Sequence, residues 1–239
     1  MKIQRYKHEG YISWTLGATL TIELLKCRPS QVNRVFFNSK TEDSNDIKYL
    51  RELCRINNIP IETNDKIFNV LSQKGNCFVI GEFRKYKGCL SNKSHIVLVN
   101  PSDMGNLGTI LRTATGFGIK NIAIIKPGTD CFDPKVVRAS MGAIFSVEIE
   151  YFESIKEYCD KFPNHARYAF MLSAAAKSLS EIKFKEPCSL VFGNEATGLP
   201  VEYADLCDPV IIKHSSDIDS LNLSIAAGIA MFEFTRNNW

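Results

Sequence analysis

Three short motifs hold the residues of this chain that are best suited to chemistry. Residues 106–112 read NLGTILR, residues 193–199 read GNEATGL and residues 220–226 read SLNLSIA. Together they supply an arginine, a carboxylate, side-chain amides and glycines that let a backbone approach a ligand closely. Such a set of groups could hold a neutral or cationic cofactor and act on a hydroxyl group near a phosphate.

The first motif lies where a helix is predicted to begin after an apolar run. Asn106 is a preferred N-cap residue, so its simplest interpretation is a cap. Arg112 lies among apolar neighbours, and a charge in such surroundings needs a partner. Because helical side chains lean towards the helix N-terminus, we expect its guanidinium group near the end of the preceding strand rather than in solvent. A structural salt bridge is the alternative.

The second and third motifs also follow apolar runs. Gly193 and Gly198 flank Glu195 at the end of a predicted strand, where α/β sheets bind ligands. A glycine turn with a solvated glutamate would give the same pattern. In the third motif, Ser220 or Asn222 is placed to cap the last helix. Small residues in that helix predict close packing, against the sheet or against a second subunit.

The alternation of strand-like and helix-like segments predicts an α/β fold in two parts. In residues 89–239 the predicted strands are 96–99, 121–125, 145–149, 168–172, 189–192 and 210–212. Their apolar runs are continuous rather than alternating, which indicates a mostly parallel sheet with helices on both faces. The helices predicted for this part are 107–117, 134–141, 154–162, 200–206 and 223–235.

Residues 1–88 are predicted to form a smaller α/β module. Its predicted helices are 16–25, 46–57 and 65–71, and its predicted strands are 32–37, 59–62 and 77–83, before a basic linker over 84–88. The module holds 15 lysines and arginines against 9 aspartates and glutamates, whereas residues 89–239 hold 14 against 17. This asymmetry favours a polyanion-binding part joined to a part that does chemistry, with an unevenly charged solvated surface as the alternative.

The cysteines and the apolar stretches exclude several classes of protein. The eight cysteines form no C-x-x-C pair, so neither a zinc site nor a redox motif is indicated, and we interpret them as reduced thiols of a cytoplasmic protein. No apolar stretch is long enough to cross a bilayer, and the N-terminus lacks the apolar core of a signal peptide. We therefore expect no bound metal and no membrane partner.

The three motifs, in their order and spacing, resemble the SpoU (TrmH-type) branch of the SPOUT superfamily, which are S-adenosylmethionine-dependent RNA ribose 2′-O-methyltransferases. The resemblance covers residues from about 94 to 236 and includes residues 138–143, RASMGA, which are similar to a Ser-x-Gly-Ala turn of the family. It implies a catalytic domain over 89–239 with a deep trefoil knot, a homodimer packed through that domain, and RNA rather than DNA as the partner. Residues 1–88 resemble a ribosomal-protein-like substrate-binding module, which favours ribosomal RNA over transfer RNA.

The resemblance also assigns roles to the motif residues. S-adenosylmethionine would be held, largely through backbone atoms, by Gly193, Ile212, Leu221, Asn222 and Ser173. The reaction site would be lined by Asn106, Arg112, Glu195, Asn222 and Ser220. Within this set, Arg112 would activate the ribose hydroxyl group, and Glu195 would hold Asn106 or Arg112 in place.

One segment departs from the family pattern. Residues 213–214, Lys-His, stand where the family usually has proline and an apolar residue, and Ser216 stands where a glycine is frequent. This departure leaves the path of the cofactor loop and the Ile212 contact open. Lys213 could instead reach an RNA phosphate.

Other functions stay open at the level of the sequence. A catalytically silent RNA-binding protein of the same fold would need neither Arg112 nor Glu195. A nucleotide-dependent oxidoreductase would need a fuller glycine fingerprint and an acidic ribose partner about 20 residues further on, and neither is evident. A 2′-O-methyltransferase that acts on transfer RNA is the third alternative.

Overall fold

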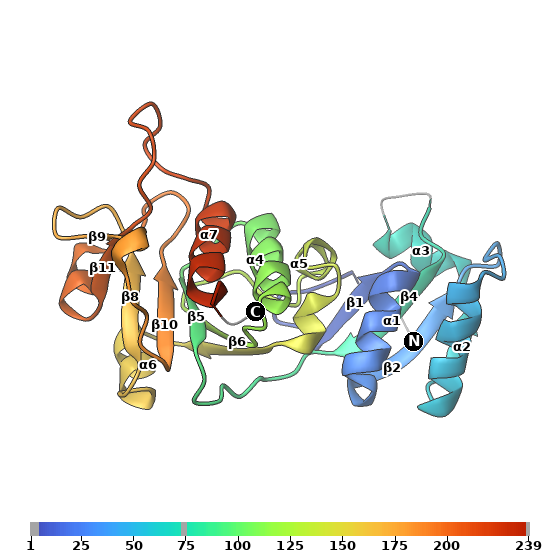
Figure 1. Cartoon of the computed structure of the whole chain (residues 1–239). Helices are drawn as coiled ribbons and strands as arrows, with labels where there is room; N and C mark the ends of the chain where they lie inside the picture. The colour runs from blue at the N-terminus through green and yellow to red at the C-terminus, as the bar shows by residue number, and fades with distance from the viewer. Residues whose placement is uncertain (1–4, 73–75, 238–239) are drawn as a thin grey trace. The chain divides into compact units, whose positions relative to one another are not determined.

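The computed structural model describes residues 5–72 and 76–237, which form two compact units (Figure 1). Unit 1 comprises Met1–Tyr86 together with Asp130–Ser146, and unit 2 comprises Lys87–Thr129 together with Val147–Trp239. By its contacts, the segment 130–146 therefore packs with the N-terminal part of the chain. The sequence predicted one boundary at residue 88, whereas unit 1 also includes the segment 130–146.

Unit 1 contains a four-stranded mixed sheet. Its strands are β1 (Ile12–Leu16), β2 (Val32–Phe37), β3 (Ile61–Thr63) and β4 (Val79–Arg84), in the order β1-β4-β2-β3. β4 is antiparallel to both of its neighbours, and β2 pairs with β3 in parallel. The helices of this unit are α1 (Ala18–Cys27), α2 (Asn45–Ile56), α3 (Asp65–Leu71) and α5 (Pro134–Ala139), with short 3-10 turns at Pro29–Gln31 and Ala143–Ser146.

The segment 130–146 supplies part of the core of unit 1. The ring of Phe83 packs edge-on against Phe132 and Phe145, with centroid distances of 6.0 and 5.3 Å. Asp133 caps α5 by accepting the backbone N–H of Lys135, as its position before proline predicts. The apolar side chains of this segment are thus buried within the N-terminal unit.

Unit 2 is built on a seven-stranded sheet in which every recorded strand pair is parallel. The strands are β5 (His95–Val99), β6 (Asn121–Ile125), β7 (Glu148–Phe152), β8 (Ala166–Phe170), β9 (Lys177–Ser178), β10 (Cys188–Phe192) and β11 (Asp208–Ile211). Their order across the sheet is β7-β6-β5-β10-β8-β11-β9. The predicted parallel sheet is confirmed, and all carboxyl ends of its strands lie at one edge.

Helices complete unit 2 and cover its sheet. They are α4 (Met104–Gly116), α6 (Ile155–Lys161) and α7 (Leu223–Thr235), with 3-10 turns at Leu179–Glu181 and Val201–Asp205. α4 and α7 lie side by side (Figure 1), and the rings of Phe117 and Phe232 approach to 6.4 Å between them. Successive strand residues point to opposite faces, and both Val97 and Leu98 of β5 are buried. The sheet is therefore covered on both faces, as its continuous apolar runs predict.

Several predicted boundaries were wrong. The helix predicted to start at residue 16 begins at Ala18, because Leu16 ends a strand that the sequence did not reveal. The strand predicted over 145–149 begins at Glu148, since Phe145 belongs to a 3-10 turn, and the helix predicted over 200–206 is also a 3-10 turn. The short strand β9 was missed. The trefoil knot stays a prediction of the resemblance.

Among the helices of the described residues, none has the length and apolar character that a bilayer span requires. The same residues contain no cluster of three or more histidine, cysteine or acidic side chains placed to bind a metal ion.

Candidate functional site

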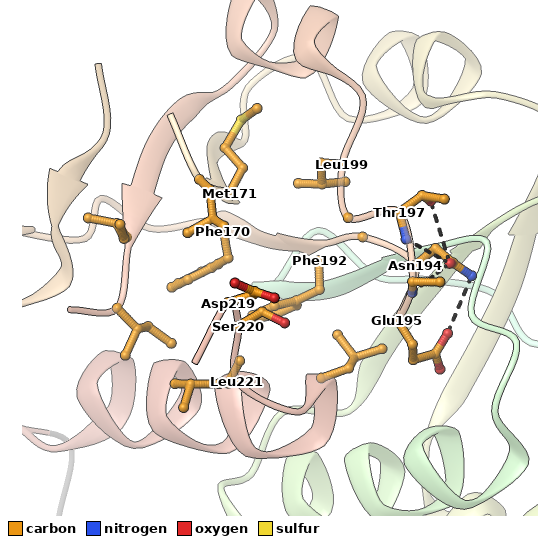
Figure 2. A pocket seen from close by; sticks show the side chains of 18 of the residues that line it. Phe170, Met171, Phe192, Asn194, Glu195, Thr197, Leu199, Asp219, Ser220 and Leu221 are labelled. Atoms are coloured by element: carbon orange, nitrogen blue, oxygen red, sulfur yellow. Dashed lines mark hydrogen bonds between the residues drawn. The ribbon is translucent and has the colours of Figure 1, made fainter. Parts of the chain in front are cut away.

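A cavity of about 410 Å³ lies at the carboxyl edge of the sheet in unit 2 (Figure 2). Three adjacent strands contribute their ends to it, namely β10, β8 and β11. The glycine-containing loop after β10 and residues 219–221 before α7 complete the wall. The cavity thus joins the second and third sequence motifs, as the strand-end argument predicts.

The predicted site residues divide into two groups. Those that line the cavity are Gly193, Glu195, Ile212, Ser220 and Leu221. Those that do not are Asn106, Arg112, Ser173 and Asn222. Ser173 instead shapes its own loop, because its hydroxyl oxygen accepts the backbone N–H of Ala175 at 3.2 Å.

The loop after β10 is a tight turn that requires both of its glycines. Asn194 and Gly198 exchange two backbone hydrogen bonds, of 3.1 and 2.9 Å. A Cβ atom on Gly193 would lie 2.1 Å from the carbonyl carbon of Gly198, and Gly198 itself has a φ angle of +68°. Gly193 therefore permits the close approach of two backbone segments, and Gly198 permits the turn.

Glu195 connects this loop to the start of α4. Its carboxylate accepts the hydroxyl and the backbone N–H of Ser102, at 2.8 and 3.1 Å, and the backbone N–H of Asp103 at 3.1 Å. Partial burial alone would raise the pKa of this carboxyl group, but the hydrogen bonds from Ser102 and Asp103 outweigh it and hold the pKa of Glu195 below its ordinary value of 4.5. Glu195 is therefore an ionised anchor and a poor proton acceptor.

Asn106 and Asn222 extend this network across the site. The side-chain amide of Asn106 donates to Glu195 at 3.5 Å, and the amide of Asn222 donates to the side-chain oxygen of Asn106 at 3.1 Å. The side-chain oxygen of Asn222 accepts the backbone N–H groups of Ser224 and Ile225, so Asn222 is the N-cap of α7. One residue of each motif thus belongs to a single chain of hydrogen bonds.

The expected cap role of Asn106 was wrong. The N-cap of α4 is Asp103, whose carboxylate accepts the backbone N–H of Asn106 at 2.7 Å. The helix begins earlier than the sequence indicated, and Asn106 lies in its first turn. This position frees the Asn106 side chain to bind Glu195 and Asn222.

Arg112 is exposed to solvent on α4, rather than turned away from it as the sequence predicted. Within residues 5–72 and 76–237, no hydrogen bond or ion pair is recorded for its guanidinium group, so the alternative of a structural salt bridge is not seen. The helix that carries Asn106 therefore also presents a charged group without a protein partner among the described residues.

Sequence reasoning missed four residues that shape the site. Asn194 donates its side-chain amide to the carbonyl oxygen of Asn100 at 2.8 Å, which fixes the glycine loop on the end of β5. Ser102 binds Glu195, as described above. His214 lines the cavity, and its Nδ1–H donates to the carbonyl oxygen of Ile212 at 2.8 Å. Asp219 lines the cavity next to Ser220. Asn194 had a sequence signal, because it lies between two motif residues, and His214 had one, because it departs from the family pattern, whereas Ser102 and Asp219 had none.

The walls of the cavity suit a nucleoside. The rings of Phe170 and Phe192 stack with their centroids 4.6 Å apart and 12° between their planes, and apolar residues at the ends of β8 and β11 continue this surface. Polar backbone groups at the strand ends and in the glycine loop supply directed hydrogen bonds. An apolar wall with backbone polar groups fits an adenosine-containing cofactor such as S-adenosylmethionine.

Comparison with known proteins agrees with this geometry. The sequence model of the SpoU rRNA Methylase family matches residues 93–232. The chain is 33% identical over 146 residues to a protein of Synechocystis described as an uncharacterized tRNA/rRNA methyltransferase, covering 60% of this chain and 53% of that protein. It is 29% identical over 148 residues to a 23S rRNA (uridine(2479)-2′-O)-methyltransferase of Streptomyces viridochromogenes, covering 59% of this chain and 52% of that protein. These matches span about half the length of each relative.

The structural likeness extends over almost the whole chain. The crystal structure of an AdoMet-bound rRNA methyltransferase from Sinorhizobium meliloti superposes with a TM-score of 0.81 and 26% sequence identity. The superposition covers 96% of this chain and 88% of that chain, so it includes the N-terminal part that the family match leaves out.

Proposed function

Because the chain belongs to the SpoU rRNA Methylase family, we propose that it transfers a methyl group from S-adenosylmethionine to a ribose 2′-hydroxyl of RNA. The observation that carries the proposal is the convergence of all three motifs at one sheet edge. There a nucleoside-sized cavity adjoins the hydrogen-bond chain of Asn106, Glu195 and Asn222. A simple RNA-binding protein has no use for such a cavity, and the match to the SpoU rRNA Methylase family argues against an oxidoreductase.

The cavity would hold the cofactor through Gly193, Ile212 and Leu221, which line it. When bound, S-adenosylmethionine supplies an electrophilic methyl group on a sulfonium centre. The Glu195–Asn106–Asn222 chain holds the start of α4 and the start of α7 against the glycine loop, which fixes the geometry that an in-line transfer requires. Glu195 is a positioning residue in this scheme, because its carboxylate is already hydrogen-bonded and its pKa is lowered.

Arg112 is the proposed catalytic residue. Its exposed guanidinium group can bind an RNA phosphate, and a planar arginine fork suits that contact. An arginine held in this way would orient the neighbouring 2′-hydroxyl and stabilise the negative charge that develops on its oxygen. Arginine stays protonated near neutral pH, so we assign it orientation and charge stabilisation rather than proton removal.

Ribosomal RNA is the substrate we favour over transfer RNA. Two likenesses support this choice, one to the 23S rRNA methyltransferase of Streptomyces viridochromogenes and one to the rRNA methyltransferase structure from Sinorhizobium meliloti, which extends over the N-terminal part of the chain as well. Exposed lysines of unit 1, such as Lys40, Lys48 and Lys66, would contact phosphates. Transfer RNA stays the alternative, since the relative in Synechocystis is described for both substrates.

We also propose a homodimer that packs through unit 2. Three apolar side chains at helical spacing on α7 are exposed, namely Ile225 at 55%, Ile229 at 38% and Phe232 at 57%. An apolar stripe on a helix is the usual sign of a missing partner. A second copy of the chain, with the same stripe about a two-fold axis, would cover it.

The test of the function is a transfer assay with isotopically labelled S-adenosylmethionine and ribosomal RNA, followed by digestion and mass spectrometry of the nucleosides. We expect a 2′-O-methylnucleoside, and we expect Arg112→Ala to abolish its formation while cofactor binding stays within about twofold of wild type. Lys156→Ala, which removes an exposed charge on α6, is the matched control and should retain full activity. A product methylated on a base would contradict the proposal.

A further inference from the structure

We propose that the carboxylate of Asp219 is the anionic partner of the sulfonium group of the methyl donor, and that it makes the cavity prefer this donor over the thioether product, whose sulfur is uncharged. This inference rests on the proposed function, because it assumes that the cavity of unit 2 holds S-adenosylmethionine. It assigns a specificity role to a residue directly before the third motif.

The position of Asp219 in the cavity lining is the first argument. Asp219 lines the cavity together with Ser220 and Leu221, and Figure 2 draws its carboxylate among the side chains that face the cavity. Glu195 is the other acidic residue of the lining, but its oxygens are taken up by Ser102 and Asp103. For Asp219, no hydrogen bond or ion pair is recorded in the part of the chain that the structure describes. Its carboxylate is therefore available to a ligand.

The negative charge of the residues that line the cavity is the second argument. Among the described residues that line the cavity there are two carboxylates and neither a lysine nor an arginine. His214 is the one basic side chain of this lining, and its Nδ1–H is used by the carbonyl oxygen of Ile212. The lining is thus negatively charged as a whole, which favours a ligand with a net positive charge.

The charge of the ligand completes the argument. Asp219 is exposed, so its carboxylate attracts a cation through a partly screened coulombic interaction. A sulfonium ion carries one positive charge that the thioether lacks, so this attraction favours the donor over the product.

The same loop provides a matched control. Asp217 lies two residues earlier, does not line the cavity, and accepts a hydrogen bond from the Ser215 hydroxyl at 2.6 Å. Asp217→Asn and Asp219→Asn remove the same charge from the same loop. Only the second variant removes it from the cavity.

The experiment is calorimetric titration of wild type and both variants with S-adenosylmethionine and with S-adenosylhomocysteine. We expect Asp219→Asn to weaken binding of the charged donor by roughly tenfold and binding of the thioether by less than about twofold, as the loss of one partly solvated charge interaction predicts. Asp217→Asn should leave both affinities at the wild-type values. The wild-type preference for the donor should also decrease with added salt, and Asp219→Asn should show a weaker salt dependence.

Two results would overturn the inference in distinguishable ways. If Asp219→Asn binds both ligands as wild type does, or weakens both equally while its melting temperature is unchanged, the inference fails and the proposed function stands. If the wild-type protein binds neither ligand, the proposed function fails, and this inference fails with it.

Discussion

Asn222 connects two elements of the site through the two ends of one amide. Its oxygen accepts the first free N–H groups of α7, and its nitrogen donates to Asn106 on α4. A cap and a link between two helices are thus combined in one side chain. Substitutions that separate these two hydrogen-bonding roles can show which of them the reaction depends on.

Asn222→Asp and Asn222→Ala make that separation. Aspartate keeps the cap but has no N–H to donate to Asn106, whereas alanine can neither cap the helix nor bind Asn106. We expect Asn222→Ala to lower the free energy of unfolding by about 1 kcal/mol. Asn222→Asp should keep the wild-type stability and still reduce methyl transfer, as measured by thermal melts and single-turnover rates. Full activity in Asn222→Asp would show that the hydrogen bond to Asn106 is dispensable.

At the scale of residues, the sequence indicated the hydrogen-bonded motif residues but neither Ser102, which donates to Glu195, nor Asp219, which lines the cavity. Glu195 and Asn222 stand out because each belongs to a motif with glycine or capping residues. Ser102 and Asp219 do not, because a serine and an aspartate in a polar loop have many uses. Their roles follow only from hydrogen bonds or a shared cavity that involve residues far apart in the chain, such as the 2.8 Å bond from Ser102 to Glu195.

At the scale of elements, a buried polar network holds the amino ends of the strands opposite the site. The Nε2–H of His95 donates to the carbonyl oxygen of Ser91 at 2.8 Å, so its Nδ1 accepts the hydroxyl of Tyr158 at 2.8 Å. The hydroxyl of Ser189 then bonds to Tyr158 at 2.6 Å, which joins β5, α6 and β10. Burial lowers the pKa of His95 from 6.5 to about 4, so the ring is neutral in the folded protein.

This network predicts a loss of stability in acid. Between pH 6.5 and about 4 the unfolded chain binds a proton at His95 that the folded chain does not bind, so stability decreases as the pH falls through that window. In His95→Gln, which cannot titrate, we expect the slope of unfolding free energy against pH to be smaller by up to about 1.4 kcal/mol per pH unit. The measurement is urea unfolding at several pH values.

His8→Gln is the control for that experiment, because His8 is exposed in unit 1. Its slope should match that of wild type. His165 contributes to the remaining slope, since burial lowers its pKa as well and its ring lies 4.5 Å from that of His95. An unchanged slope in His95→Gln would mean that His95 does not stay neutral on folding.

The sequence predicted the bounds of several helices and strands correctly but missed two short strands beside them. β2, β6, α3 and α7 have the bounds that the sequence indicated. β1 was missed because Ile12–Leu16 merges with the apolar start of α1, and periodicity does not separate them. β9 has two residues, too few for any pattern, and is held in place by its pairing with β11.

At the scale of the whole molecule, the asymmetry of charge predicts how RNA binding responds to salt. One test would be to delete residues 1–88, but the deletion would also expose Phe132 and Phe145, which pack against Phe83 in unit 1. Charge substitutions are therefore the cleaner test of RNA binding. We expect Lys48→Ala with Lys66→Ala to weaken RNA binding and to reduce the slope of log K against log salt by about 1 for each phosphate that the protein no longer binds. Lys156→Ala in unit 2 should leave the slope unchanged. An unchanged slope in the double variant would remove these two lysines from the RNA surface.

The exposed apolar stripe of α7 predicts the oligomeric state of the protein. If a second copy covers the α7 stripe, lysines placed there would bury charge without a partner, which a dimer interface does not tolerate. We expect Ile225→Lys with Phe232→Lys to be monomeric by light scattering and the wild type to be dimeric. Ile56→Lys is the control, because Ile56 is apolar and 60% exposed but lies on α2 in unit 1. A monomeric wild type at the concentration of the transfer assay would show that one chain suffices, and the exposed face of α7 would then need a different partner.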